Sequence, residues 1–160
     1  MYCIWLTFDS SALSESIFKL AQKYNSPVFQ PHCTLIGKTD VPLPRIKSAV
    51  IDLISNYKPI DVHPVRISYS DNLWRSLYIE IYEKKVLTKW HKDISDLLSI
   101  NYYKSFLPHI SLMYNTISVR EKKKLCGEIK LKSAYKISSI KIIDCSEKVE
   151  EWSTVFELKI

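Results

Sequence analysis

The stretch Pro31-His32-Cys33-Thr34-Leu35 has a counterpart later in the chain, Pro108-His109-Ile110-Ser111-Leu112. Both stretches have the pattern Pro-His-x-(Ser/Thr)-Leu. The chain contains only four histidines, so two such matches are expected by chance on the order of once in a hundred thousand sequences of this composition. We therefore interpret the two stretches as equivalent positions of an internal repeat.

Each stretch is predicted to be a β-strand, the first over residues 32–37 and the second over about 106–114. Because side chains at positions i and i+2 of a strand point to the same face, His32 and Thr34 project together, as do His109 and Ser111. If a pseudo-two-fold axis relates the two halves of the chain, both pairs face a single cleft.

The segments around the two stretches repeat in the same order. Strand, helix, strand, helix, strand describes residues 2–70 and again residues 74–143, with one further strand at the end. Strands are expected at 2–8, 32–37, 60–70, 74–82, 106–114, 135–143 and 152–159. Helices are expected at 11–24, 44–57 and 85–98, and a short basic helix follows the capping-box residues Ser118 and Glu121.

This order predicts an α+β protein formed by internal duplication. We expect one bilobal domain over residues 1–160, with a first lobe of about residues 1–70 and a second of about 72–160. Two antiparallel-type sheets would surround a central cleft, with the helices outside. Either lobe alone would be too small to bury a good core, and the cleft between them is the expected ligand site.

The composition excludes several classes of protein. Hydrophobic residues make up 46% and charged residues 25% of the chain, as in an ordinary globular protein. Two glycines are too few for a Gly-rich dinucleotide or phosphate loop. The net charge of +6 favours anionic ligands without indicating nucleic acid. No apolar run has the length of a membrane span and no signal peptide is evident, so a cytoplasmic protein without membrane association is expected.

The cysteines predict neither a zinc site nor a secreted disulfide framework. They are Cys3, Cys33, Cys126 and Cys145, and no two of them form a CxxC pair. We expect reduced, mostly buried thiols.

Two histidines and two hydroxyls around one point suit phosphoryl chemistry. One imidazole can deprotonate an attacking water while the other protonates a leaving alkoxide, and hydroxyls can donate hydrogen bonds to phosphoryl oxygens. This chemistry needs no metal and no cofactor. A zinc site on His32 and His109 would lack a third and a fourth ligand. His63 and His91 have no such neighbours and are given no functional role; His91 is expected to face solvent.

The two stretches resemble the paired motifs of the 2H phosphoesterase superfamily. Residues 26–34 (Ser-Pro-Val-Phe-Gln-Pro-His-Cys-Thr) and 107–114 (Leu-Pro-His-Ile-Ser-Leu-Met-Tyr) are similar to those of its cyclic phosphodiesterase group from plants and yeast. The segments Tyr2-Cys3-Ile4-Trp5 and Trp152-Ser153-Thr154-Val155 resemble the first and last strands of that group. Residues 38–62 and 115–148 carry no signature of the family.

The resemblance implies hydrolysis of a small nucleotide cyclic phosphate by a monomer. Substrates of the group are nucleoside 2′,3′-cyclic phosphates, which give 2′-phosphates, and ADP-ribose 1″,2″-cyclic phosphate. By analogy, His32, His109, Thr34 and Ser111 are catalytic, with His109 as base and His32 as acid. Tyr114 and Trp74 would bind substrate, with Trp74 stacking on the base; core packing is the alternative for both aromatics. Trp5 is expected in the core.

Two other functions stay open. The first is an RNA-end-processing enzyme, similar to 2′-5′ RNA ligases or RNA 2′,3′-cyclic phosphodiesterases, which needs a basic channel for the strand. Residues 115–119, directly after the second motif, contain no basic residue, which favours the small substrate. The second is a non-catalytic RNA-binding module; the intact histidines and hydroxyls argue against it.

Overall fold

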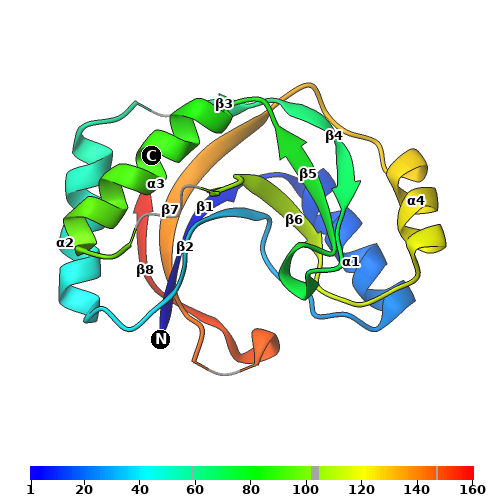
Figure 1. Cartoon of the computed structure of the whole chain (residues 1–160), viewed down its shortest axis with the longest axis horizontal. Coiled ribbons are helices and arrows are strands. Elements are labelled where there is room, and N and C mark those ends of the chain that lie inside the picture. Colours follow the sequence, from blue (N-terminus) through cyan, green and yellow to red (C-terminus); the bar gives the residue numbers. More distant parts are fainter. Residues whose placement is uncertain (59, 102–104, 147) are drawn as a thin grey trace.

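The computed structural model describes residues 1–58, 60–101, 105–146 and 148–160 (Figure 1). Its α-helices are α1 (Ser11–Tyr24), α2 (Leu43–Ser55), α3 (Lys84–Leu98) and α4 (Val119–Glu128). Its strands are β1 (Tyr2–Phe8), β2 (His32–Thr39), β3 (Asp61–Val62), β4 (Pro64–Tyr69), β5 (Leu77–Ile81), β6 (His109–Met113), β7 (Tyr135–Asp144) and β8 (Ser153–Lys159). Short 3₁₀ helices cover Leu73–Arg75 and Val149–Glu151. The predicted α+β class is confirmed.

The strands form two antiparallel sheets. The larger has the order β2-β1-β7-β3, with β8 also paired to β7, and the smaller has the order β4-β5-β6. Helices α2 and α3 lie beside the larger sheet, and α1 and α4 lie beside the smaller one (Figure 1). This arrangement confirms two antiparallel sheets with helices outside.

The two halves of the chain exchange strands, which differs from the predicted lobes of residues 1–70 and 72–160. Strand β4 belongs to the first half but pairs with β5 in the smaller sheet. Strand β7 belongs to the second half but pairs with β1 in the larger sheet. The central strands β1 and β5 each have one neighbour from their own half and one from the other half. The order of elements repeats, but each sheet is built from both halves.

Three predicted strands are clearly shorter than expected, and one of them, predicted over about 106–114, covers His109–Met113. The segment 60–70 divides at His63 into β3, which joins the larger sheet, and β4, which joins the smaller one. The strand predicted to begin at Trp74 begins at Leu77 instead. The Asn72 side chain accepts a hydrogen bond from the Trp74 N–H (2.9 Å), and such local bonds compete with strand pairing. Trp74 therefore lies on the short 3₁₀ helix Leu73–Arg75, within the turn between β4 and β5.

The predicted apolar faces of the helices are mostly buried, and three side chains differ in burial from the expectation. Residues such as Ile17 of α1, Val50 of α2 and Ile94 of α3 lie in the main core. The spacing of apolar residues in the helix predicted over 85–98 places Leu97 on its buried face, but Leu97 is exposed. His91, predicted to face solvent, is buried: it stacks on Phe106 and its Nδ1 bonds the Leu35 carbonyl (2.8 Å).

Lys122 is the third exception. The basic run of residues 122–124 has the composition of a solvated helix face, yet the Lys122 side chain is buried.

Among the described residues, no helix is both long enough and apolar enough to cross a membrane.

Candidate functional site

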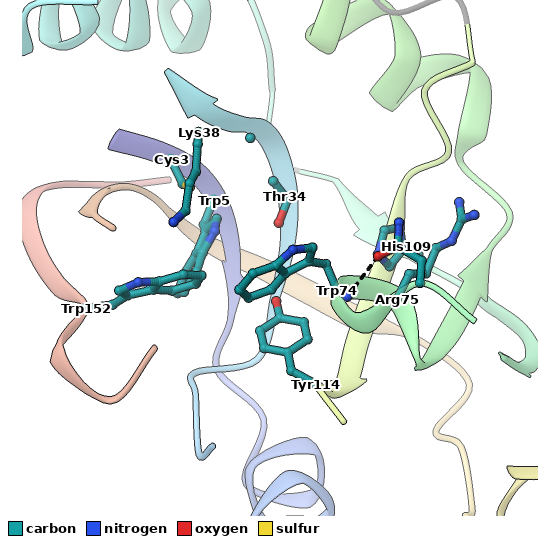
Figure 2. A pocket seen from close by; sticks show the side chains of 11 residues that line it. Cys3, Trp5, Thr34, Lys38, Trp74, Arg75, His109, Tyr114 and Trp152 are labelled. Atoms are coloured by element: carbon teal, nitrogen blue, oxygen red, sulfur yellow. Dashed lines mark hydrogen bonds between the residues drawn. The ribbon is translucent and has the colours of Figure 1, made fainter. Parts of the chain in front are cut away.

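A cavity of ≈ 360 Å³ lies where the two sheets face each other. It is lined by residues from both sheets and from the turns beside them: Cys3, Trp5, Thr34, Gly37, Lys38, Asn72, Trp74, Arg75, His109, Tyr114 and Trp152. Figure 2 shows Trp5, Lys38 and Trp152 on one side of this cavity and His109 and Arg75 on the other. Two of the lining residues are basic and none is acidic, so the lining favours an anionic ligand.

The four motif residues lie at two depths. His109 and Thr34 line the cavity. His32 and Ser111 are buried and lie behind its wall, with exposed fractions of 0% and 2%. Tyr114, which lines the cavity, bridges the two depths because its hydroxyl donates a hydrogen bond to His32 Nε2 (3.0 Å). The structure therefore brings both motifs to one cavity. The second motif reaches it through His109, and the first motif reaches it through Thr34 and through the hydrogen bond between His32 and Tyr114.

The two imidazoles are held in the same way. His32 Nδ1 lies 2.6 Å from the Gln30 carbonyl, and His109 Nδ1 lies 2.7 Å from the Leu107 carbonyl. A carbonyl only accepts, so Nδ1 is the protonated nitrogen and Nε2 carries the lone pair in each neutral ring. In both motifs the accepting residue precedes a proline, which restricts it to an extended backbone. The repeated Pro-His pair thus fixes the tautomer twice.

His32 is enclosed by aromatic rings. It stacks on Trp5 (centroids 3.6 Å apart, planes at 9°) and meets the Phe29 ring edge-on (5.5 Å, 70°). This burial lowers the pKa of His32 to about 3, although the Gln30 carbonyl opposes the change. The ring is therefore neutral at pH 7 in the free protein, which agrees with its accepting the Tyr114 hydrogen bond.

His109 is only half-buried, and its ring meets Tyr78 edge-on (5.2 Å, 69°). Burial is the main cause that lowers its pKa; the Leu107 carbonyl opposes this and the nearby Arg75 guanidinium adds to it. A lowered pKa keeps the Nε2 lone pair available at neutral pH, as a general base requires.

Arg75 is a cavity residue that sequence reasoning missed. Its guanidinium lies over the Tyr78 ring (5.5 Å), and its buried Nε has no hydrogen-bond partner among the described residues. Because Arg75 lines the cavity and is positively charged, its guanidinium is a candidate contact for an anionic ligand. Arg75 directly follows Trp74, which the resemblance assigns to substrate binding, and this adjacency could have identified Arg75 as a site residue.

Three tryptophans form the apolar wall of the cavity. Trp74, 46% exposed, stacks on Trp152 (5.8 Å, 20°), and Trp152 meets Trp5 at a tilt (5.8 Å, 57°). Trp74 also packs edge-on against Tyr114 (5.4 Å, 73°). The structure therefore places Trp74 at the cavity and not in the core. Trp5, expected in the core, is buried and also lines the cavity.

Tyr114 is both a lining residue and a packed one. Strand β6 ends at Met113, which frees Tyr114 from the alternation that would point it away from His109. Its ring stacks on Phe29 (4.2 Å, 20°). Burial raises the pKa of Tyr114, and the Ser111 hydroxyl opposes the change. The phenol therefore keeps its proton at neutral pH.

Lys38 and Trp152 were also missed. The Lys38 ammonium lies 6.0 Å from the Trp74 ring and 5.8 Å from the Trp152 ring. Lys38 stands an even number of positions after His32 and Thr34, so strand alternation could have assigned it to their face. Trp152 approaches the cavity from the turn before β8, and no local pattern marks it as a site residue.

A second, more polar cavity of ≈ 840 Å³ adjoins the first. The two share Thr34, Gly37, Lys38, Arg75 and His109. The second cavity continues past Ser99 and Phe106, so a ligand larger than a mononucleotide could extend from one into the other. In the described ranges no group of three or more histidine, cysteine or acidic residues could hold a metal ion.

Comparisons with known proteins find similarity in structure alone. No family model and no curated protein matches the sequence. A crystal structure of a phosphoesterase matches with a TM-score of 0.69 at 10% identity, over 99% of this chain and 97% of that chain. The crystal structure of E. coli LigT complexed with NADP+ matches with a TM-score of 0.66 at 10% identity, over 99% of this chain and 96% of that chain.

A third solved structure, the protein TT0787 of Thermus thermophilus, matches with a TM-score of 0.66 at 12% identity, over 99% of this chain and 97% of that chain. Identities this low establish the fold and not the activity. The chain has, over almost its whole length, the fold of E. coli LigT and of this phosphoesterase, which confirms the fold predicted from the sequence.

Proposed function

We propose that this chain is a cyclic phosphodiesterase of the 2H type, which hydrolyses a small nucleotide cyclic phosphate without a metal. The observation that carries the proposal is the meeting of both motifs at one cavity. His109 and Thr34 line that cavity, and His32 is hydrogen-bonded to Tyr114, which also lines it. Two titratable rings with matching tautomers on two sides of one basic cavity suit paired acid–base catalysis.

In this proposal His109 is the base. Its Nε2 takes a proton from a water molecule as the water oxygen forms a bond to phosphorus. The bond from phosphorus to one ring oxygen breaks, and that oxygen receives a proton from the His32 side of the cavity. The lining hydroxyl of Thr34 and the basic residues Lys38 and Arg75 would stabilise the phosphoryl oxygens.

The acid side contains two groups in series. His32 Nε2 reaches the cavity through the Tyr114 hydroxyl. Binding of an anionic phosphate favours the imidazolium form of His32, because a nearby negative charge raises the pKa of a histidine. Tyr114 then passes its proton to the leaving oxygen and takes one from His32. After this transfer His32 is neutral, and the Tyr114 hydroxyl again donates a hydrogen bond to His32 Nε2, as in the free protein.

The aromatic wall supports a nucleotide as the substrate. A flat base stacks well on exposed aromatic rings, and Trp74 is an exposed ring at the cavity. E. coli LigT, which shares the fold, has been crystallised with NADP+. Nucleoside 2′,3′-cyclic phosphates and ADP-ribose 1″,2″-cyclic phosphate are the substrates that we propose.

The second cavity favours an alternative, an enzyme that acts on RNA ends. The polar extension past Ser99 and Phe106 could hold the nucleotides that precede a terminal cyclic phosphate. A mononucleotide would leave this extension empty. The choice between the two substrates therefore depends on whether activity rises with strand length.

A panel of cyclic phosphates assayed with EDTA present tests both functions, with products identified by phosphorus NMR. We expect hydrolysis of the small substrates, and a fall in turnover of roughly a hundred-fold or more in His32→Ala and in His109→Ala. His63→Ala is the matched control, because His63 is exposed and bonds Glu83 (2.6 Å) away from the cavity; it should retain full activity.

Three outcomes would count against the proposal. Preference for cyclic-phosphate RNA over mononucleotides would select the RNA-end enzyme. Near-normal turnover in either cavity-histidine variant would refute the two-histidine mechanism. Salt-sensitive RNA binding without hydrolysis would indicate a binding module.

A further inference from the structure

Two cysteines meet beside the cavity: Cys3 belongs to its lining, and Cys145 lies behind Cys3. The sulfurs of Cys3 and Cys145 lie 2.9 Å apart, and both residues are buried. A disulfide holds its sulfurs about 2.05 Å apart, so a relative movement of about 1 Å would bring the pair to bonding distance. No spacing in the sequence indicates this contact.

The β1–β7 ladder holds the two thiols together. Cys3 lies opposite Ile143, and the Cys145 N–H donates to the Met1 carbonyl (2.9 Å) directly beyond the end of β7. Cys145 therefore follows the partner of Cys3 by two residues, on the same face of the ladder. The contact belongs to paired backbone and does not depend on a loop conformation.

The pair is also placed to react. Cys3 lines the cavity, so a small solute that enters the cavity reaches it. The hydrogen bond with Cys3, with a smaller contribution from the Lys38 ammonium, lowers the pKa of the Cys145 thiol despite its burial. A lowered pKa favours the thiolate, which is the form that reacts with oxidants.

We propose that Cys3 and Cys145 are an oxidisable dithiol, which closes to a disulfide when the folded protein meets hydrogen peroxide. The thiolate of one cysteine attacks one peroxide oxygen, the O–O bond breaks, and a sulfenic acid and hydroxide form. The second sulfur attacks the sulfenic sulfur and expels water. In total, two thiols lose two electrons and two protons, and one peroxide becomes two water molecules.

The disulfide would stiffen one side of the site. Cys3 and Cys145 pack with Trp5, Ile143 and Trp152 in a small apolar cluster separate from the main core. Trp5 and Trp152 are also part of the cavity wall. A covalent bond within this cluster would link the first strand to the segment after β7, and would fix the backbone on which Trp5 lies.

Graded hydrogen peroxide, followed by denaturation, alkylation and peptide mass mapping of the full chain, tests the proposal. We expect one cross-linked peptide pair containing Cys3 and Cys145, with a mass lower by two hydrogen atoms, and alkylation only at Cys33 and Cys126. The melting temperature should rise by about 5 °C or more, because the bond closes a long loop. Dithiothreitol should reverse both changes.

Matched variants separate this pair from the other thiols. Cys126→Ser should leave the cross-link and the melting shift unchanged, since Cys126 lies on α4. Cys145→Ser should abolish both. Unlinked sulfinic acid at Cys3, or a cross-link through Cys33 or Cys126, would overturn the proposal. The wild-type peptide map decides this even if Cys145→Ser does not fold.

Discussion

At the scale of single residues, the two histidines differ in burial. His109 lines the cavity and has a lone pair on Nε2, whereas His32 is enclosed by Trp5 and Phe29 and is hydrogen-bonded to Tyr114, which lines the cavity. The same motif thus gives an accessible ring in one sheet and a shielded ring in the other. Tyr114 completes the shielded half of the site.

The burial of His32 makes stability depend on pH. Its pKa is about 3 in the folded protein against about 6.5 when unfolded, so the unfolded chain binds an extra proton between these values. The contribution of His32 to stability is fully present above about pH 6.5 and is lost as the pH falls towards 3. From pH 7 to pH 5, the free energy of unfolding should fall about 2 kcal/mol less in His32→Gln than in the wild type.

Urea unfolding at the two pH values measures this difference. The other three histidines are common to both proteins and cancel in the comparison. Equal pH dependence in both proteins would show that His32 titrates normally.

The Tyr114 hydroxyl should matter for turnover more than for binding. Tyr114→Phe keeps the ring that stacks on Phe29 but removes the O–H between His32 and the cavity. We expect kcat to fall roughly ten-fold or more, because proton transfer to the leaving group is impaired. Steady-state kinetics separate the two roles, since a raised KM with unchanged kcat would mean that Tyr114 only binds substrate.

Trp74 should contribute mainly to binding. Because its ring is 46% exposed, its loss removes little core packing. Trp74→Ala should weaken substrate binding by about 1–3 kcal/mol, the range found for base–aromatic stacking, and this loss should appear as a higher KM. Trp74→Phe should recover most of the lost binding free energy. Melting temperature and KM measured on one preparation test this. A large fall in melting temperature with unchanged KM would assign Trp74 to the core.

At the scale of elements, α4 anchors the turn that carries Trp74 and Arg75. The Lys122 side chain, 2% exposed, donates to the Ser70 carbonyl (2.7 Å), where β4 leads into the turn. The Ser70 hydroxyl in turn donates to the Arg75 carbonyl (2.7 Å). A buried lysine therefore connects a helix outside the sheet to one wall of the cavity.

Lys122→Met should loosen this turn. Methionine keeps an unbranched apolar side chain but leaves the Ser70 carbonyl without its donor, at a cost of about 1–3 kcal/mol in unfolding free energy. KM should rise together with the loss of stability, because Trp74 and Arg75 lose their anchor. Lys123→Met, at an exposed position of the same helix, is the control. Identical stability and KM in both variants would refute the anchoring role.

At the scale of the whole molecule, the exchange of strands joins the two halves into one cooperative unit. Each sheet contains strands from both halves. One helix of each half also packs against a strand of the other half: α1 packs against β6, and α3 packs against β2. Neither sheet can form while the other half is unfolded.

Unfolding in urea should therefore be a single transition. Tryptophan fluorescence, which reports on the cavity wall and on Trp90 in the core, should coincide with far-UV circular dichroism across the transition. Two separated transitions would show that the lobes are independent units, as in a chain divided near residue 70.

The features that the sequence predicts are local ones. Helix faces follow from the spacing of apolar residues, and the shared face of His32 and Thr34 follows from strand alternation. The paired motifs indicated the α+β duplication and the two-histidine site, because a repeated pattern implies equivalent places in the fold. Trp74 and Tyr114 were assigned by resemblance, and the structure places both at the cavity.

Partners and depth were decided only by the tertiary structure. Alternation says which face a side chain takes, but not which strand lies beside it. It therefore could not predict that β7 pairs with β1 and β4 pairs with β5. Burial is likewise a property of what packs above a residue. His32 behind Tyr114, Lys122 under the turn and the contact of Cys3 with Cys145 all depend on segments far apart in the chain, whose approach no local pattern records.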